Sequence, residues 1–163
     1  MKAITLKNLT KSYQNTTLFK NVTFSVAKGE RIAITGENGV GKSTLLRIIT
    51  GDEPFDSGKL QVEQHLSAYI PQAFSGDTTL GVLEYLDTMQ AGNAVFDIIK
   101  QFGVLSDDDI TNAQLNELSG GQQRIVEIAA VLSRAPMFLC IDEPENHLDI
   151  KSRMVLTDLL KQY

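Results

Sequence analysis

Residues 36–44 carry the most specific chemistry in this sequence. They read Gly-Glu-Asn-Gly-Val-Gly-Lys-Ser-Thr and fit the pattern G-x-x-x-x-G-K-[ST], whose glycines let backbone N–H groups curl around phosphate oxygens. Lys42 supplies a point charge for the outer phosphates, and Ser43 offers an oxygen to the magnesium ion that accompanies a nucleoside triphosphate. The pattern predicts a phosphate-binding loop made of Gly36, Glu37, Asn38, Gly39, Val40, Gly41, Lys42, Ser43 and Thr44.

Two adjacent acids form a second group that could do chemistry. Asp142 and Glu143 directly follow residues 137–141, an apolar run that predicts a buried strand. Charges at the end of a buried strand are costly unless they have partners or a task. In α/β sheets this edge is where ligands bind, so the pair predicts part of a ligand site.

Paired glycines ahead of a helix form a third group, Leu118, Ser119, Gly120, Gly121 and Gln122. Glycines at a helix start expose backbone donors that suit a phosphate group. A serine in the same place is also an ordinary N-cap beside a flexible turn. The residues alone leave both interpretations open.

Apolar periodicity predicts the elements that must position these groups. Residues 31–35 form a short apolar run, typical of a buried parallel strand, that leads into the phosphate loop. Residues 42–50 have apolar side chains at helical spacing, and Gly51 is a plausible C-terminal stop. The start of this helix should therefore face the phosphates with its positive dipole end.

The remaining chain predicts short strands and a helical layer. Residues 4–9 and 22–26 alternate apolar and polar side chains, and residues 68–70 are strand-like before Pro71. Two later segments each place apolar side chains on one helical face, and we expect those faces to pack into a core. These two segments are residues 80–89 and 93–102.

Two single residues each keep two interpretations. Tyr13 lies in a loop, where an aromatic ring is either a platform for stacking adenine or hydrophobic cover for an edge. Gln72 follows the strand that ends at Pro71, where its side chain could reach an ion or could merely be solvated.

The bulk properties favour one domain of 163 residues in a reducing compartment. The net charge of -5 and the pI near 5.0 argue against binding RNA or anionic lipid by charge alone. The single cysteine, Cys140, lies in an apolar run and fits a small core residue. Without a visible signal peptide or membrane-length apolar run, we expect a cytoplasmic chain.

Over essentially its whole length the sequence resembles the ATP-binding cassette (ABC) ATPases. Residues 36–44 resemble the Walker A loop, and residues 138–142 with Glu143 resemble the Walker B strand and catalytic glutamate. The resemblance implies a P-loop NTPase: an α/β fold with a central, mostly parallel sheet, an N-terminal antiparallel β subdomain and an inserted helical subdomain near residues 73–134. The other matching elements are Tyr13 (A-loop), Gln72 (Q-loop), residues 118–122 (signature motif) and Leu148 with Asp149 (D-loop).

The resemblance also implies the chemistry of ATP hydrolysis with Mg2+. Lys42 and the loop amides would hold the β and γ phosphates. Ser43, Gln72 and Asp142 would hold magnesium directly or through water. Glu143 would orient and deprotonate the attacking water, because phosphoryl transfer depends on positioning and charge stabilisation.

Members of this family act as head-to-tail pairs, so the signature residues 118–122 would contact ATP held by a second cassette. The sequence shows no internal repeat that could supply that cassette. The family's switch histidine lies beyond the D-loop and the next strand. His147 lies before Asp149 and does not match it, and His65 lies in a polar turn. The final strand and switch-histidine segment are therefore expected to be absent from residues 1–163.

Three biological roles remain open. Residues 143–149 read EPENHLD and resemble the EPTNHLD run of the ABC-F branch, soluble ATPases that act on ribosomes, although Glu145 replaces the usual threonine. The alternative is the ATP-binding subunit of a membrane ABC transporter, peripheral at the membrane and docked on a transmembrane partner. The third is a nucleotide-binding module without turnover, which the pairing of Asp142 with Glu143 disfavours.

Overall fold

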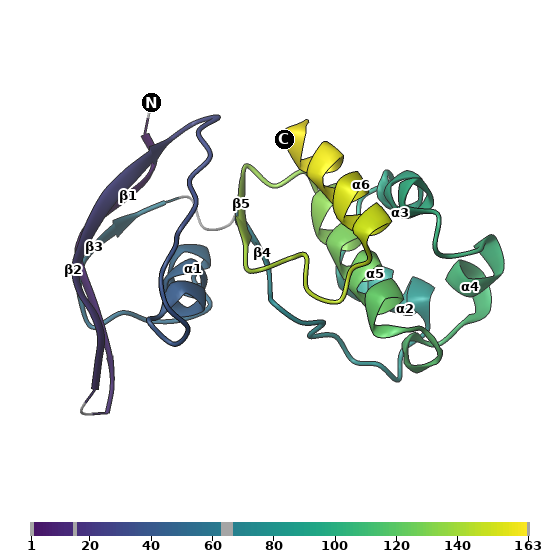
Figure 1. Cartoon of the computed structure of the whole chain (residues 1–163), viewed down its shortest axis with the longest axis horizontal. Coiled ribbons are helices and arrows are strands. Elements are labelled where there is room, and N and C mark those ends of the chain that lie inside the picture. The colour runs from purple at the N-terminus through teal and green to yellow at the C-terminus, as the bar shows by residue number, and fades with distance from the viewer. Residues whose placement is uncertain (1, 15, 63–66, 163) are drawn as a thin grey trace. The chain divides into compact units, whose positions relative to one another are not determined.

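The computed structural model describes residues 2–14, 16–62 and 67–162 (Figure 1). His65 lies outside the described residues. The chain divides into two compact units. Unit 1 comprises Met1–Tyr69 and Phe138–Asp142, and unit 2 comprises Ile70–Met137 and Glu143–Tyr163. No helix among the described residues is long and apolar enough to cross a membrane.

Unit 1 contains a three-stranded antiparallel sheet in the order β2-β1-β3. The strands are β1 (Lys2–Tyr13), β2 (Thr16–Ala27) and β3 (Ser57–Gln61). The strand patterns predicted over residues 4–9 and 22–26 are confirmed as parts of longer strands. The register of β1 shifts between Leu6 and Leu9, where Asn8 has a φ of 51°. This irregularity lets both leucines, an odd number of positions apart, bury their side chains completely.

The helix predicted over residues 42–50 is confirmed as α1 (Lys42–Thr50), and it packs against this sheet. Its buried residues join β1 residues and Cys140 in one hydrophobic cluster. The helix ends at Gly51, whose φ of 92° is left-handed and whose N–H donates to the carbonyl of Arg47. Burial, with a smaller effect of the Asp52 carboxylate, raises the pKa of the Cys140 thiol to about 12. The cysteine is therefore a protonated core residue, as expected.

The strands β4 (Ser67–Ile70) and β5 (Phe138–Ile141) pair in the second, parallel sheet. The fold class is confirmed: an α/β chain with an antiparallel β part and a parallel sheet. One expectation is wrong in this structure, because residues 31–35 lie outside every assigned strand and Ile32 is 46% exposed. Apolar character alone does not form a strand, since its backbone hydrogen bonds come from a neighbour distant in sequence.

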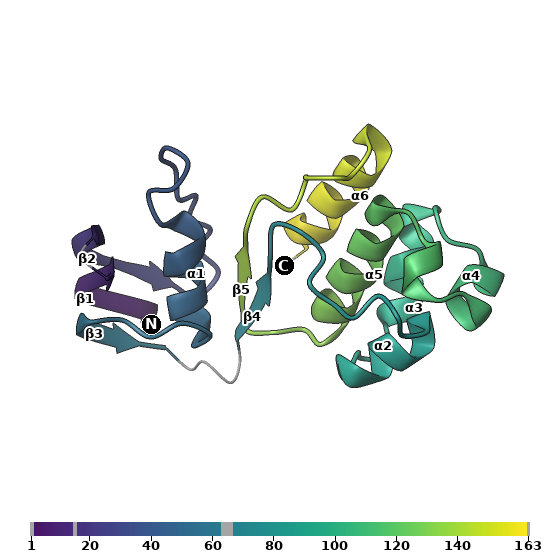
Figure 2. The same ribbon diagram turned by 90° about the horizontal axis from the view of Figure 1, so that it is seen from below.

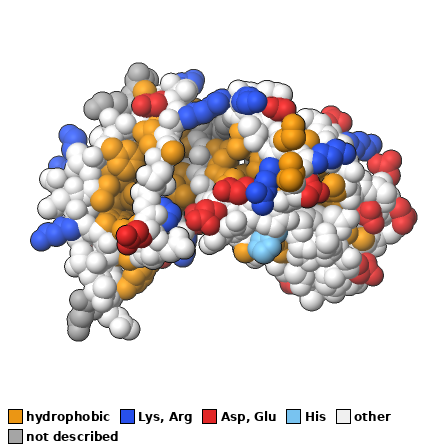
Figure 3. Space-filling view, viewed as in Figure 1, with side chains coloured by type: hydrophobic (Ala, Val, Ile, Leu, Met, Phe, Trp, Pro, Cys, Tyr) orange, Lys and Arg blue, Asp and Glu red, His pale blue; other side chains and the backbone are white. Residues whose placement is uncertain are grey.

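Unit 2 is helical. Its α-helices are α2 (Val82–Thr88), α3 (Val95–Phe102), α4 (Asp107–Asn112), α5 (Gly120–Ser133) and α6 (Ile150–Lys161), with a 3-10 turn at Leu115–Glu117. The helices predicted over 80–89 and 93–102 are confirmed as the shorter α2 and α3. Helix α5 is buried along most of its length, and α2 and α3 pack against it (Figure 2). Acidic side chains gather at the surface over α4, whose first turn holds three aspartates (Figure 3).

Candidate functional site

The predicted phosphate loop lies in unit 1 and leads directly into α1. Gly41 immediately precedes the helix, and residues 36–40 are exposed. Gly39 and Gly41 have φ angles of 82° and 103°, which glycine adopts without strain. A Cβ on Gly41 would lie 2.7 Å from the side chain of Leu18 and 3.0 Å from that of Phe19. Position 41 therefore needs glycine both for its backbone angle and for its close contact with β2.

The ammonium group of Lys42 folds back over the loop that precedes it. Its Nζ donates to the carbonyl oxygens of Gly36 at 2.9 Å and Glu37 at 3.0 Å. Val40 closes a turn in the same loop by donating its N–H to the Glu37 carbonyl at 3.4 Å. The structure thus places the Lys42 ammonium group next to the backbone that the sequence predicts to bind phosphate. In the same motif, Asn38 is exposed and Thr44 is half-buried.

Two oxygen-bearing side chains of unit 1 come from the elements predicted to hold magnesium. Ser43 is exposed in the first turn of α1, and Asp142 is only 5% exposed directly after β5. The hydroxyl of Tyr69 donates to Asp142 Oδ2 at 3.0 Å. Burial and the neighbouring carboxylate raise the pKa of Tyr69, so the tyrosine remains a neutral donor.

These donors fit magnesium in the form that nucleotide sites use. Hydroxyl and carboxylate oxygens are hard ligands, and magnesium usually keeps waters and phosphate oxygens instead of an all-protein cage. Across the described residues, no three His, Cys, Asp or Glu side chains are grouped to hold a metal ion. Ser43 and Asp142 therefore fit a magnesium ion that arrives with a nucleotide.

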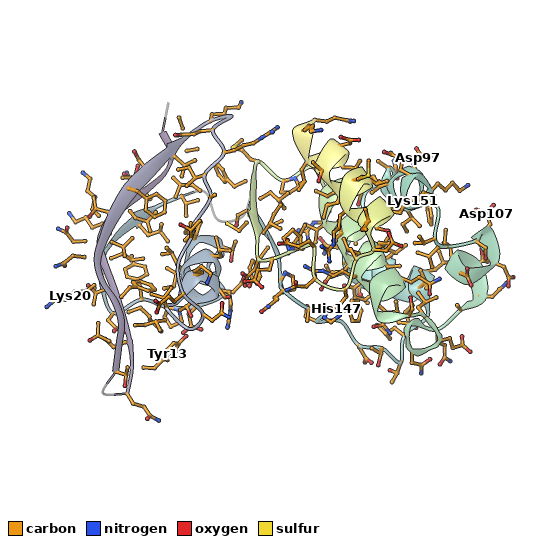
Figure 4. The ribbon with its side chains drawn as sticks, viewed as in Figure 1. Tyr13, Lys20, Asp97, Asp107, His147 and Lys151 are labelled. Carbon is orange, nitrogen blue, oxygen red and sulfur yellow. The ribbon has the colours of Figure 1, made fainter. Side chains whose placement is uncertain are left out.

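Tyr13 lies at the hairpin end of β1, and its side chain is 45% exposed (Figure 4). Its hydroxyl donates to Glu53 Oε1 at 2.9 Å, and the Lys11 Nζ lies 4.6 Å from the ring centroid. Lys11 also pairs with Glu53 at 2.7 Å. The ring is therefore anchored at its hydroxyl and by a cation, and it remains accessible for stacking.

The proposed catalytic carboxylate lies in unit 2, where two amide groups hold it. Gln72 Nε2 donates to Glu143 Oε2 at 2.8 Å, and Asn146 Nδ2 donates to the same oxygen at 3.1 Å. Glu143 has a φ of 42°, a left-handed conformation that is uncommon for this residue type. Gln72 is exposed, but its side chain is bound to the carboxylate, so the simply solvated interpretation is wrong in this structure.

The signature residues form the start of α5. Ser119 is the N-cap, and its hydroxyl accepts from the Gln122 N–H at 3.3 Å while the Gln122 side chain accepts from the Ser119 N–H at 2.9 Å. Leu118 is buried. Gly120 has open space around a would-be Cβ, whereas a Cβ on Gly121 would lie 2.9 Å from a backbone carbonyl oxygen, that of His147. Gly121 is therefore required for close packing, and the exposed Gly120 could approach a ligand.

The D-loop residues lead into α6. Leu148 is buried, and Asp149 is the N-cap that accepts the Ser152 N–H at 2.7 Å. Hydrogen bonds from Ser152 hold the pKa of Asp149 below its ordinary value. His147, whose φ is 67°, is exposed on unit 2 in the loop before α6 (Figure 4).

The structure distributes the predicted site residues between the two units. Unit 1 holds Tyr13, the phosphate loop and Asp142, and unit 2 holds Gln72, Glu143, the signature residues and the D-loop. The sequence reasoning missed three partners of these residues: Glu53, Tyr69 and Asn146. Asn146 carried a usable signal, since an amide three positions after an acid in a tight turn can reach back to it. Glu53 and Tyr69 are distant in sequence from their partners and gave none.

Comparisons with known proteins show the family to which this chain is related. The family model described as ABC transporter matches residues 19–146. The chain is 33% identical to the energy-dependent translational throttle protein EttA of Haemophilus influenzae, over 99% of this chain and 30% of that one. It is 30% identical to the zinc import ATP-binding protein ZnuC of Rickettsia bellii, over 96% of this chain and 69% of that one. The chain thus spans less than a third of the EttA relative.

Solved structures show the same fold. The ATP-binding cassette MJ0796, determined as a dimer in a post-hydrolysis state with ADP and Pi, superposes with a TM-score of 0.83 at 26% identity. The match covers 98% of this chain and 82% of that one. The family model spans well over half of the chain and includes the phosphate loop, the signature motif and the two acids. The chain belongs to the ABC transporter family, as an ATP-binding cassette.

Proposed function

We propose that this chain binds ATP and hydrolyses it as one member of a head-to-tail pair of cassettes. The observation that carries the proposal is the placement of the Glu143 carboxylate, whose Oε2 accepts hydrogen bonds from both Gln72 and Asn146. A module that only binds nucleotide has no need of a second acid held in this way. The solved relative with ADP and Pi supports turnover in the same fold.

The residues of this chain divide the task between binding and activation of water. Tyr13 presents an accessible ring for adenine, and Lys42 with the loop amides neutralises the outer phosphates. Glu143 orients the attacking water and takes its proton, while Gln72 and Asn146 fix the orientation of the carboxylate. Such a base contributes roughly a hundred- to ten-thousand-fold to the rate.

Magnesium fits the oxygen donors of this chain. Ser43 and Asp142 would hold it, with Gln72 contributing directly or through water. When bound, it neutralises charge that develops on the phosphoryl oxygens. Tyr69 donates to Asp142 and so keeps the carboxylate oriented, and burial keeps that tyrosine protonated.

The signature residues complete the site of the second cassette. Ser119 and Gly120 are exposed at the N-terminus of the fourteen-residue helix α5, where backbone N–H groups and the helix dipole favour a phosphate. The dimeric state of the MJ0796 cassette supports pairing. In this proposal, one cassette prepares the water and the other covers the phosphates.

Steady-state phosphate release is the test of hydrolysis. The whole chain is incubated with ATP and magnesium, and the control contains a chelator such as EDTA in excess. We expect release of phosphate that depends on magnesium and rises more steeply than linearly with protein concentration, because two cassettes form each site. Binding of ATP without any release at high protein concentration would support the structural-module interpretation instead.

For the biological role we propose an ABC-F-type ribosome-associated ATPase of the cytoplasm. The run EPENHLD at residues 143–149 and the similarity to EttA, named as a translational throttle protein, support it. The second candidate is the ATP-binding subunit of a membrane transporter, which the similarity to ZnuC favours. Cosedimentation with ribosomes in the presence of ATP distinguishes them: a ribosome-associated ATPase sediments with the particles, and a transporter subunit remains in the supernatant.

A further inference from the structure

A buried ion pair in unit 2 lies outside the proposed catalytic groups. Arg124 and Glu127 lie one helical turn apart on α5, with side chains that are 1% and 2% exposed. The Arg124 Nη1 lies 2.5 Å from Glu127 Oε2. The other fully buried side chains of this helix are apolar, so the ion pair is set in apolar surroundings.

The pair reaches from α5 to the segment that carries Gln72. The Arg124 Nη2 donates to the carbonyl oxygen of Pro71, the residue immediately before Gln72. Glu127 Oε1 accepts from the backbone N–H of Ser75 at 3.2 Å and from its hydroxyl at 3.0 Å. Residues 71–75 are thus fixed at both ends by one ion pair, with Gln72 between the two attachment points.

Stability alone does not explain this arrangement. Desolvation of a buried ion pair offsets most of its Coulomb attraction, and apolar residues of similar volume often stabilise a core as well or better. Arg124 Nε is the buried side-chain nitrogen that lacks a hydrogen-bond partner within the described part of the chain, which adds a further cost. The pair instead has a geometric consequence. Directional hydrogen bonds from the guanidinium group and to the carboxylate fix the positions of their backbone partners, which apolar contacts do not.

We propose that Arg124 and Glu127 are positioning residues that hold residues 71–75 in a fixed position against α5, so that Gln72 keeps its hydrogen bond to Glu143. The proposal rests on the proposed function for its effect on turnover. It also connects the start of α5, where the signature residues lie, to the catalytic carboxylate through protein contacts. A change at α5 then reaches Glu143 by way of Gln72.

Two NMR readouts test the positioning without any need for activity. The Ser75 amide donates to Glu127, so we expect slow hydrogen exchange at Ser75 in the wild type and exchange about tenfold faster in Arg124→Lys and Glu127→Gln. The side-chain amide signal of Gln72 should shift in the same variants. Ser75→Ala removes one hydroxyl from an exposed residue, so it should fold even if the two charge variants do not. We expect it to cause a smaller change in both readouts. Thr78→Ala, at an exposed position three residues beyond this segment, is the control.

Turnover separates a positioning role from a merely structural one. We expect Arg124→Lys and Ser75→Ala to lower kcat by about tenfold and threefold, with KM for ATP unchanged, because they remove an effect on the base and not on binding. In a Gln72→Ala background the same changes should have no further effect on kcat, since they act through Gln72.

Each outcome decides the proposal. Unchanged exchange of the residue 75 amide and an unchanged Gln72 side-chain signal in Arg124→Lys, Glu127→Gln and Ser75→Ala would overturn it. A fall in kcat of the same size with and without Gln72 would also overturn it, because the pair would then act through general stability. If the wild type hydrolyses no ATP, the proposed function fails, and the exchange and Gln72 measurements still decide whether the pair positions residues 71–75.

Discussion

At the scale of single residues, the proposed base Glu143 has an uncommon backbone conformation. Its φ of 42° is left-handed, which is uncommon for glutamate. Such conformations cost about 1–3 kcal/mol each and persist where the surroundings determine them. Around Glu143 those surroundings are the two amides of Gln72 and Asn146. The strain is therefore located at the residue to which the proposal assigns the chemistry.

The phosphate loop offers a matched pair of glycine substitutions. Gly41→Ala places a Cβ 2.7 Å from Leu18 at a φ of 103°, whereas Gly39→Ala meets nothing within 4 Å at a φ of 82°. Both variants carry a conformational cost of about 1–2 kcal/mol, and overpacking adds about 1–3 kcal/mol for Gly41→Ala alone. Chemical denaturation should show the larger loss of stability for Gly41→Ala. Equal losses would contradict the packing between the loop and β2.

At the scale of elements, the N-termini of two helices carry both a stabilising cap and a predicted site motif. Ser119 caps α5 and Asp149 caps α6, so the signature motif and the D-loop are also helix starts. The sequence left the N-cap and phosphate interpretations of Ser119 open, and the structure shows the capping. Its contact with a second cassette stays a prediction, because capping uses the side chain and leaves the exposed glycine beside it available.

The cap of α6 predicts a pH dependence of stability. The pKa of Asp149 is lowered by hydrogen bonds from Ser152, so its contribution is complete above the unfolded pKa of about 3.9 and is lost as the pH falls through the folded pKa. Asp149→Asn keeps the shape and an acceptor oxygen but not the charge. The free energy of unfolding of the wild type should exceed that of the variant at pH 7, and the difference should shrink below about pH 4. A difference that stays constant from pH 7 to pH 3 would refute the charged cap.

The contact between α5 and the loop before α6 predicts a second asymmetry between neighbouring glycines. Gly121→Ala should destabilise unit 2 by about 1–3 kcal/mol, because its Cβ would lie 2.9 Å from a backbone carbonyl that cannot easily move. Gly120→Ala, with open space, should keep or raise the unfolding temperature, since alanine favours a helix. Thermal unfolding measures both, and a stable Gly121→Ala variant would show that the loop moves without cost.

At the scale of the whole chain, local sequence patterns predicted helices and strands better than they predicted which strands pair and which side chains meet. The 3.6-residue and two-residue periodicities located α1, α2, α3 and parts of β1 and β2, because each periodicity depends on neighbouring residues. Residues 31–35 have the composition of a buried strand but lie outside the strands of this structure, since strand pairing depends on distant segments. For the same reason the motifs named Gln72 and Glu143 but gave no sign of Tyr69 or of the contacts that Arg124 and Glu127 make with Pro71 and Ser75.

The most direct test of the central claim compares binding and turnover in Glu143→Gln. The substitution keeps the shape of the side chain and removes the base, so ATP binding should match the wild type while phosphate release falls by roughly a hundredfold or more. Lys20→Gln, exposed on β2, is the control for handling and should leave both quantities unchanged. Titration of a fluorescent ATP analogue and steady-state phosphate release measure the two properties in the same preparations. Hydrolysis by Glu143→Gln at the wild-type rate would contradict the assignment of Glu143 as the base.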